Sequence, residues 1–222
     1  MLIFLNSDLS GRVEEISIDW DSDDMKMVAK KGGDILNVSF TGKYIDELIA
    51  SCYGSIGLFQ VILLKTLDKK GIRETQSKHI EICDPDLLYD VCIEYAESLR
   101  PLYEQFARIL SEGIRKRPDS TGIYAQALDA IFNFPDKDLI NGLSRDNIFR
   151  SIQNKDQRIQ SGNLHTILCK FEDIQSEKGS KTLVLSYNDA TKELSVVDRQ
   201  ILFYRKYCTA QWPWNDIIEE SR

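Results

Sequence analysis

"SGNLHTILCKFEDIQSEKGSKTLVLSYNDATKELSVVDRQILFY", residues 161–204, decides the fold. Its first part, 161–179, has the apolar spacing of a helix that is capped by Ser161 and closed by Gly179. Two β-rich runs follow, TLVLSY (182–187) and LSVVDRQILFY (194–204), and we expect them to be strands joined by the turn at 188–191. The stretch therefore predicts a helix followed by a β-hairpin.

Two further helices are expected just before this stretch. TGIYAQALDAIFNF (121–134) has apolar residues at helical spacing, and SRDNIFRSIQ (144–153) begins at Ser144, a favourable N-cap. Three helices followed by a hairpin is the order of a winged helix-turn-helix. We predict this domain over 121–207, with a tryptophan-containing tail over 208–222.

The chain upstream is predicted to be helical. Ser22 should cap a helix that ends near Gly32 and Gly33, and an extended link should cover 37–40. Two helices broken at 54–57 should follow, the second ended by Gly71. A long amphipathic stretch from Asp86 should break or kink at Pro101. We predict linking helices over 81–120, with a polar linker at 115–120 as the domain boundary. The predicted class is therefore mainly α with a small β component.

Composition is that of an ordinary globular protein of 222 residues with a net charge of −7. Residues 1–120 carry 15 basic and 21 acidic side chains, whereas 121–207 are nearly neutral, so nucleic-acid binding is disfavoured in the first half. No apolar run is long enough to span a bilayer, and MLIFL (1–5) lacks the features of a signal peptide. We therefore expect a cytoplasmic protein with no membrane partner.

The five cysteines are scattered and form no CxxC pair, and the chain has two histidines. We expect no metal site and interpret the cysteines as buried reduced thiols. No serine elbow or cysteine–histidine pair is visible in the sequence, so no catalytic residue is predicted.

Two stretches together carry a family resemblance. GRVEEISIDWDSDDMKMVAKKGGDILNVSF (11–40), followed by YIDELIASCYGSIGLFQVI (44–62), resembles the end of the core and the helical lid of AAA+ ATPases, in the origin-recognition-like branch with its STAND relatives. A winged helix commonly follows the lid in this family, and LVLSYNDATKELSVVDRQILFYRK (183–206) resembles its wing. The resemblance implies that 1–80 hold the end of the core and the lid.

Individual residues also match the family pattern. Asn6, at the end of an apolar run, resembles the sensor asparagine, and Arg12 resembles the arginine that reaches a neighbour's γ-phosphate. Arg12 also reads as an ordinary surface arginine. Residues 54–60 resemble the second-sensor turn, but no arginine stands there, and a tight connection between helices is the alternative interpretation.

The phosphate-binding motifs of this family are missing from the chain. It contains no GxxxxGK[ST] loop and no acidic Walker B strand, and phosphoryl transfer needs both the cradle and the Mg²⁺ that they hold. We expect no ATP hydrolysis and no cofactor in this chain alone. ATP and Mg²⁺ would enter only through a longer parent protein or a partner ATPase core.

The winged helix supplies the predicted binding surface. Its third helix would enter the major groove of DNA and present Asn163, His165, Thr166 and Lys170 to it. Lys181 and Lys192, near the wing, would contact the DNA backbone. Acidic residues on the same helix, Glu172 among them, oppose DNA contact, so a protein partner is equally open.

The tail carries two tryptophans, Trp212 and Trp214, which either dock on a partner or cover the chain's own core. Two functions follow from the sequence. One is a non-catalytic region of an AAA+-like ATPase that couples nucleotide state to DNA or protein binding. The other is a stand-alone protein-interaction module with no nucleotide role.

Overall fold

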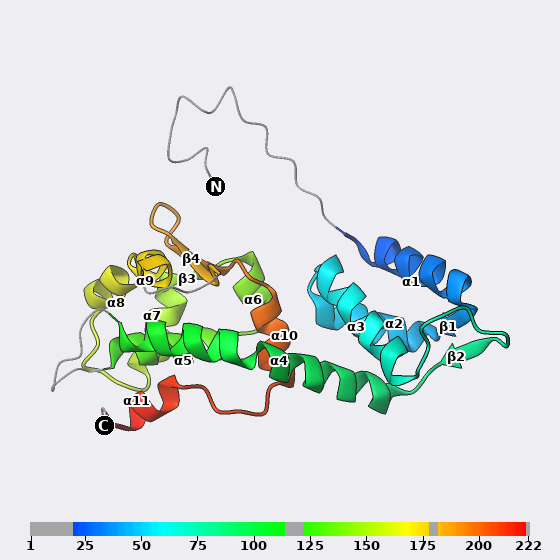
Figure 1. Ribbon diagram of the computed structural model, residues 1–222. Coiled ribbons are helices and arrows are strands. Elements are labelled where there is room, and N and C mark those ends of the chain that lie inside the picture. Colours follow the sequence, from blue (N-terminus) through cyan, green and yellow to red (C-terminus); the bar gives the residue numbers. More distant parts are fainter. Residues whose placement is uncertain (1–19, 114–121, 178–181, 221–222) are drawn as a thin grey trace.

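The computed structural model describes residues 20–113, 122–177 and 182–220. They are mainly helical with two small sheets, which confirms the predicted class (Figure 1). The first part contains α1 (Ser22–Leu36), β1 (Val38–Phe40), α2 (Gly42–Cys52), α3 (Ile56–Lys69), β2 (Ile80–Ile82) and α4 (Pro85–Glu112). The second contains α5 (Ile123–Phe132), α6 (Asp136–Asn141), β3 (Leu143–Ser144), α7 (Arg145–Gln153), α8 (Ser161–Leu168), α9 (Phe171–Glu177), β4 (Leu185–Asn188), β5 (Glu193–Val196), α10 (Gln200–Tyr207) and α11 (Trp214–Glu220).

We call residues 22–82 the N-terminal lobe and residues 123–220 the C-terminal lobe. Helix α4 belongs to both, because it packs on α3 in the first lobe and on α5, α9, α10 and α11 in the second. The two lobes lie along opposite ends of this helix (Figure 1). No helix among the described residues is long and apolar enough to cross a membrane.

The first helix corrects two sequence predictions. Asp21, not Ser22, is the N-cap of α1, since its carboxylate accepts a hydrogen bond from the Asp24 amide. The helix also continues through both glycines to Leu36. Gly33 is buried, and a Cβ there would lie 2.4 Å from the carbonyl oxygen of Val38, so the glycine allows β1 to approach the helix closely.

The predicted extended link is a strand. β1 pairs in parallel with β2, with Val38 opposite Ile80 and Phe40 opposite Ile82. The connection includes α2 and α3, which are separated at residues 53–55 as the Gly54–Gly57 pattern predicted. Ser55 is the N-cap of α3, and Gly71, at φ 70°, follows the end of that helix.

Pro101 lies inside α4 and does not break it, so the break that the sequence offered as one of two outcomes does not occur. The helix is continuous over 28 residues with the proline inside it. Its buried face extends on both sides of the proline, with Val91 and Ala96 before it and Phe106 and Leu110 after it. Tertiary burial along one face therefore outweighs the missing backbone hydrogen bond.

The C-terminal lobe holds a three-stranded antiparallel sheet with the strand order β3-β5-β4. Leu143 pairs with Leu194, and Leu185 pairs with Val196. In chain order the lobe runs α5, α6, β3, α7, α8, α9, β4, β5, α10, α11. β5, the last strand in the chain, is thus the central strand of the sheet and pairs with both others.

Three features of this lobe differ from the sequence predictions. The single helix expected over 161–179 is two, α8 and α9, and its N-cap is Gln160. The strand expected over 194–204 ends at Val196, and α10 begins at Gln200. Helix α6 was not expected, because its six residues follow Pro135 and show no clear apolar period.

Aromatic side chains close the lobe at its C-terminal end. Trp214 is buried, and it stacks on Trp212 with ring centroids 4.5 Å apart. Both indoles also stack on Phe132 of α5, each at 5.4 Å. The tail thus covers the protein's own core, the second of the two alternatives for these tryptophans.

Polar contacts join the lobes beside α4. The Arg205 guanidinium donates hydrogen bonds to the carbonyl oxygens of Phe132 and Phe134, and it forms an ion pair with Asp136. Asp136 also accepts a hydrogen bond from the Tyr53 hydroxyl at 2.8 Å. Tyr53 lies in the N-terminal lobe, so this network links α2 to α6 and α10.

Candidate functional site

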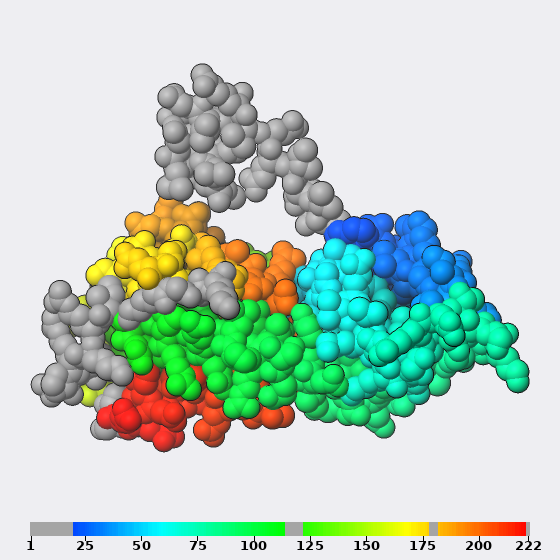
Figure 2. Space-filling view, in the orientation of Figure 1, coloured from blue at the N-terminus to red at the C-terminus, as the bar shows by residue number. Residues whose placement is uncertain are grey.

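The candidate site lies where α8 meets the turn between β4 and β5. We call it the α8–turn surface and define it by its polar side chains: Asn163, His165, Thr166, Cys169, Lys170, Asp189 and Lys192. In the space-filling view the yellow surface of α8 and α9 adjoins the orange surface of β4 and β5 on one face of the molecule (Figure 2).

Helix α8 presents a polar face because its apolar residues all point inward. Leu164, Ile167 and Leu168 are buried, and they follow the i, i+3, i+4 spacing of one helical face. Asn163 and Thr166 are exposed on the opposite side, and Lys170 is exposed just beyond the helix. The structure therefore places these three predicted residues together on one accessible surface.

The turn between the strands is fixed by its own side chains. The Asn188 side-chain oxygen accepts hydrogen bonds from the amides of Ala190 and Thr191. Lys192 adopts a left-handed backbone conformation at φ 59°. This geometry brings Asp189 over the last turn of α8.

His165, Cys169 and Asp189 form a compact cluster there. His165 and Cys169 lie four residues apart on one face of the helix. The His165 Nε2 atom is 3.9 Å from Cys169 Sγ and 3.5 Å from an Asp189 carboxylate oxygen. The ligand atoms of the three side chains all lie within 4.8 Å of one another. The structure thus brings together a cysteine and a histidine that the sequence analysis did not pair, with a carboxylate beside them.

A fourth side chain orients the imidazole. The Tyr187 hydroxyl lies 3.4 Å from Nδ1 of His165, and the two rings meet edge to face. In the tautomer in which Nδ1–H donates to this hydroxyl, Nε2 is the unprotonated nitrogen. Tyr187 is buried, and burial raises the pKa of its hydroxyl, so the tyrosine is neutral.

Charges around the cluster are largely balanced. Lys192 forms an ion pair with Asp189, and this hydrogen bond lowers the pKa of the carboxyl. Desolvation, and then the negative charge of Asp189, raise the pKa of the Cys169 thiol. Arg145 is paired with Asp146 nearby. Lys192 is thus paired with a carboxylate of the surface, whereas Lys170 is exposed to solvent.

Acidic residues flank the surface as the sequence indicated. Glu172 accepts a hydrogen bond from Ser186 of β4, and Asp173 is exposed on α9. Because α9 is a separate helix, these carboxylates do not continue the face of α8 in a straight line.

Three predicted site residues lie outside the described residues: Asn6 and Arg12, the nucleotide-sensing candidates, and Lys181. The turn compared with the second sensor is described. There Arg199, at the start of α10, donates a hydrogen bond to the carbonyl oxygen of Tyr53. The same guanidinium nitrogen lies 3.2 Å from a Cβ placed on Gly54, so the turn faces the C-terminal lobe.

The cysteines differ from the sequence interpretation. All five are free, but only Cys52 and Cys92 are buried, while Cys83 and Cys169 are exposed. Burial raises the pKa of Cys52 to about 12 and that of Cys92 to about 11, so both thiols are protonated.

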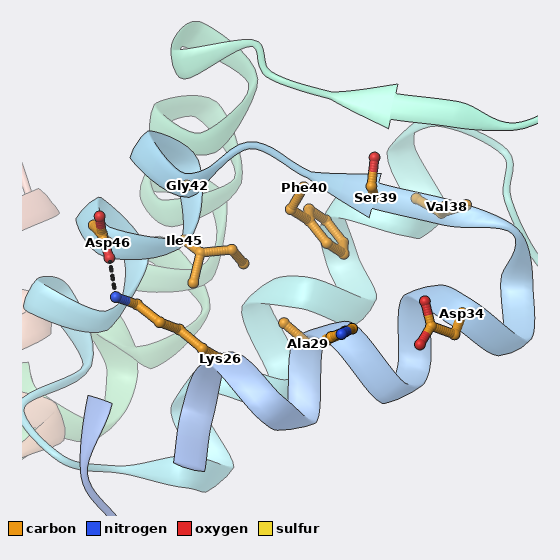
Figure 3. Close-up of a pocket in the computed structure, with 10 residues that line it drawn as sticks. Lys26, Ala29, Asp34, Val38, Ser39, Phe40, Gly42, Ile45 and Asp46 are labelled. Carbon is orange, nitrogen blue, oxygen red and sulfur yellow. Dashed lines mark ion pairs between the residues drawn. The ribbon is translucent and has the colours of Figure 1, made fainter. Parts of the chain in front are cut away.

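The N-terminal lobe has a separate cavity of about 360 Å³ between α1, β1 and α2 (Figure 3). Ala29, Phe40 and Ile45 give it an apolar wall, and an ion pair of 2.8 Å between Lys26 and Asp46 bridges α1 and α2 at its edge. The hydrogen bond to Asp46 raises the pKa of Lys26. The cavity is suited to a small apolar group and contains no catalytic grouping among its described residues.

No protein-family model, curated protein or solved structure matches the chain.

Proposed function

We propose that the chain is a non-catalytic coupling module of an AAA+/STAND-like ATPase, in which a lid-like lobe is joined to a winged-helix lobe that binds DNA. The observation that carries the proposal is the strand order β3-β5-β4, with the helices α5, α7 and α8 placed before the hairpin. A winged helix has this combination of helices, a short first strand and a hairpin. The α8 face would then be the groove-facing surface.

The junction between the lobes supports the coupling role. Helix α4 packs on both lobes, and α10 returns from the hairpin to contact α2. At that contact the Ser51 hydroxyl lies 2.8 Å from the Tyr207 hydroxyl and accepts a hydrogen bond from the Lys206 ammonium. A displacement of the lid-like lobe would therefore be transmitted to the element that follows the wing.

Equilibrium binding to a labelled DNA duplex over a range of salt concentrations tests the DNA contact. We expect affinity to fall with salt, with a log–log slope of about −2 to −3 if two or three phosphates are neutralised. Lys170→Glu should weaken binding at least tenfold, because it reverses an exposed charge on the α8–turn surface. Lys31→Glu, an exposed lysine on α1, is the matched control and should change affinity little.

A second candidate, a stand-alone protein-interaction module, is favoured by the charge pairing of Lys192 with Asp189 and of Arg145 with Asp146. Such pairing leaves fewer cations for phosphates. Absence of duplex binding at low salt, or equal loss in both lysine variants, would reject DNA contact and support this candidate.

The ATPase relationship has its own test. The chain alone should release no phosphate from ATP and Mg²⁺ above background, since its sequence has no phosphate-binding loop. A strand–GxxxxGK[ST]–helix unit in frame before Met1, or in a protein that co-purifies with the chain, would support the coupling role. Phosphate release by the purified chain would contradict the proposal.

A further inference from the structure

We propose that His165, Cys169 and Asp189 form a zinc site that fastens the β4–β5 turn to α8. The site needs neither DNA nor a parent ATPase. Its three side chains differ in chemistry and converge from α8 and from the β4–β5 turn of the C-terminal lobe.

The spacing of the three ligand atoms suits a tetrahedral ion. Zn²⁺ bonds of about 2.0–2.3 Å to nitrogen, sulfur and oxygen place neighbouring ligand atoms roughly 3.4–3.7 Å apart. His165 Nε2 lies 3.9 Å from Cys169 Sγ and 3.5 Å from the Asp189 carboxylate. Cys169 Sγ and the Asp189 carboxylate lie within 4.8 Å of each other, so side-chain shifts of at most about 1 Å complete the geometry.

The chemistry of the set selects the metal. An imidazole, a thiolate and a carboxylate together suit Zn²⁺, whereas Ca²⁺ and Mg²⁺ take oxygen ligands. Three protein ligands leave the fourth position for water or for a ligand from a binding partner. Zinc binding displaces the thiol proton of Cys169, because a coordinated thiol is deprotonated by the cation.

Tyr187 lies on the far side of the imidazole, with its hydroxyl 3.4 Å from Nδ1 of His165. In the tautomer in which Nδ1–H donates to this hydroxyl, Nε2 is left as the metal ligand. The tyrosine is itself buried against the sheet, so the imidazole is held before the metal arrives.

Lys192 competes with the metal for Asp189, and this competition predicts a measurable effect of Lys192 on zinc affinity. Its ammonium forms an ion pair with the same carboxylate oxygen of Asp189 that faces His165. Zinc has to displace this ammonium or share the carboxylate through its second oxygen. Removing the lysine charge should therefore strengthen zinc binding, the opposite of its effect on phosphate binding.

The test is a titration of the full chain with Co²⁺ and Zn²⁺ under reducing conditions, without DNA. We expect one Co²⁺ per chain, with thiolate-to-metal charge-transfer absorption and tetrahedral bands that Zn²⁺ abolishes. Cys169→Ser should remove the charge-transfer band. His165→Gln and Asp189→Asn should each weaken Zn²⁺ binding at least tenfold, and Tyr187→Phe should weaken it about tenfold.

Two control variants lie outside the cluster. Cys83→Ser removes the other exposed thiol, and His79→Gln removes the other histidine, and both should bind Co²⁺ as the wild type does. Lys192→Gln should bind Zn²⁺ about fivefold more tightly, as expected from removing one competing charge at a surface site. Circular dichroism of every variant confirms that it is folded.

Three results would overturn the proposal: no 1:1 binding at micromolar metal, a charge-transfer band retained in folded Cys169→Ser, or equal losses in Cys83→Ser. Duplex binding measured with a chelator present separates the two proposals. If the duplex is not bound, DNA contact is rejected and the zinc site is unaffected. If Co²⁺ and Zn²⁺ are not bound but the duplex is, the zinc site is rejected and DNA contact is unaffected.

Discussion

Gly33 and its neighbour Gly32 have opposite environments although both lie inside α1. A Cβ on Gly33 would meet the Val38 carbonyl oxygen at 2.4 Å, whereas nothing lies within 4 Å of one on Gly32. We expect Gly33→Ala to lower the free energy of unfolding by about 1–3 kcal/mol, since the strand has to move away. Urea denaturation measures this change.

Gly32→Ala is the matched control. It should raise stability by about 0.5–1 kcal/mol, because alanine is the better helix former and meets no neighbour. Equal effects of the two substitutions would contradict the close approach of β1 to α1.

Asp156 links pH to stability in the C-terminal lobe. Hydrogen bonds from the Arg158 guanidinium, and then from the Gln126 amide, lower the pKa of this carboxyl. A lowered pKa stabilises the fold above the unfolded value of about 3.9, and this contribution is lost as the pH falls through the folded pKa.

We therefore expect Asp156→Asn to be less stable than the wild type at pH 7, with a difference that shrinks below about pH 4. Urea denaturation at a series of pH values checks this, with Asp90→Asn on the exposed face of α4 as the control. A constant difference down to pH 2 would exclude the linkage.

At the level of elements, Pro101 is the least favourable residue in α4. It is exposed, it lies inside a continuous helix, and it has no amide proton for the i−4 carbonyl. Pro101→Ala should raise the free energy of unfolding by up to about 3 kcal/mol. Thermal unfolding gives the measurement, and an unchanged or lower midpoint would mean that the proline supports a bend the lobes require.

Most elements could be predicted from sequence because local signals specify them. Ser144 and Ser55 are side-chain caps, and the alternation in β4 and β5 matches a half-buried sheet. The misplaced boundaries depend on tertiary contacts instead. Gly33 stays helical because β1 packs on it. The short β2 forms because it pairs with β1, whose residues lie 42 positions upstream.

The candidate site was predictable only in part for the same reason. Helical spacing grouped Asn163, Thr166 and Lys170, which depends on α8 alone. Asp189 reaches His165 only after the hairpin folds back over the helix. The four-residue spacing from His165 to Cys169 was a local signal, but its third member is distant in sequence.

At the level of the whole molecule, Arg205 of α10 holds the Asp136 carboxylate, which in turn accepts a hydrogen bond from the N-terminal lobe. Its guanidinium satisfies two carbonyl oxygens after α5 and pairs with Asp136, the acceptor of the Tyr53 hydroxyl. Arg205→Met should lower the free energy of unfolding by about 2–4 kcal/mol, because it leaves a partly buried carboxylate without its cation. Arg108→Met, an exposed arginine on α4, is the control.

Because α4 is shared, we expect the wild-type chain to unfold in one transition. Far-UV circular dichroism and tryptophan fluorescence, which reports mainly on Trp212 and Trp214 in the C-terminal lobe, should give coincident curves. Separate transitions would show that the lobes are independently stable.

The return of α10 onto α2 also governs the order of events during synthesis. Ser51 leaves the ribosome 156 residues before Tyr207, its hydrogen-bond partner. The nascent N-terminal lobe therefore has its α2 surface uncovered until the segment around Tyr207 has emerged from the ribosome. Docking of the lobes is a late step in folding. A ribosome stalled near residue 190 would hold this face open.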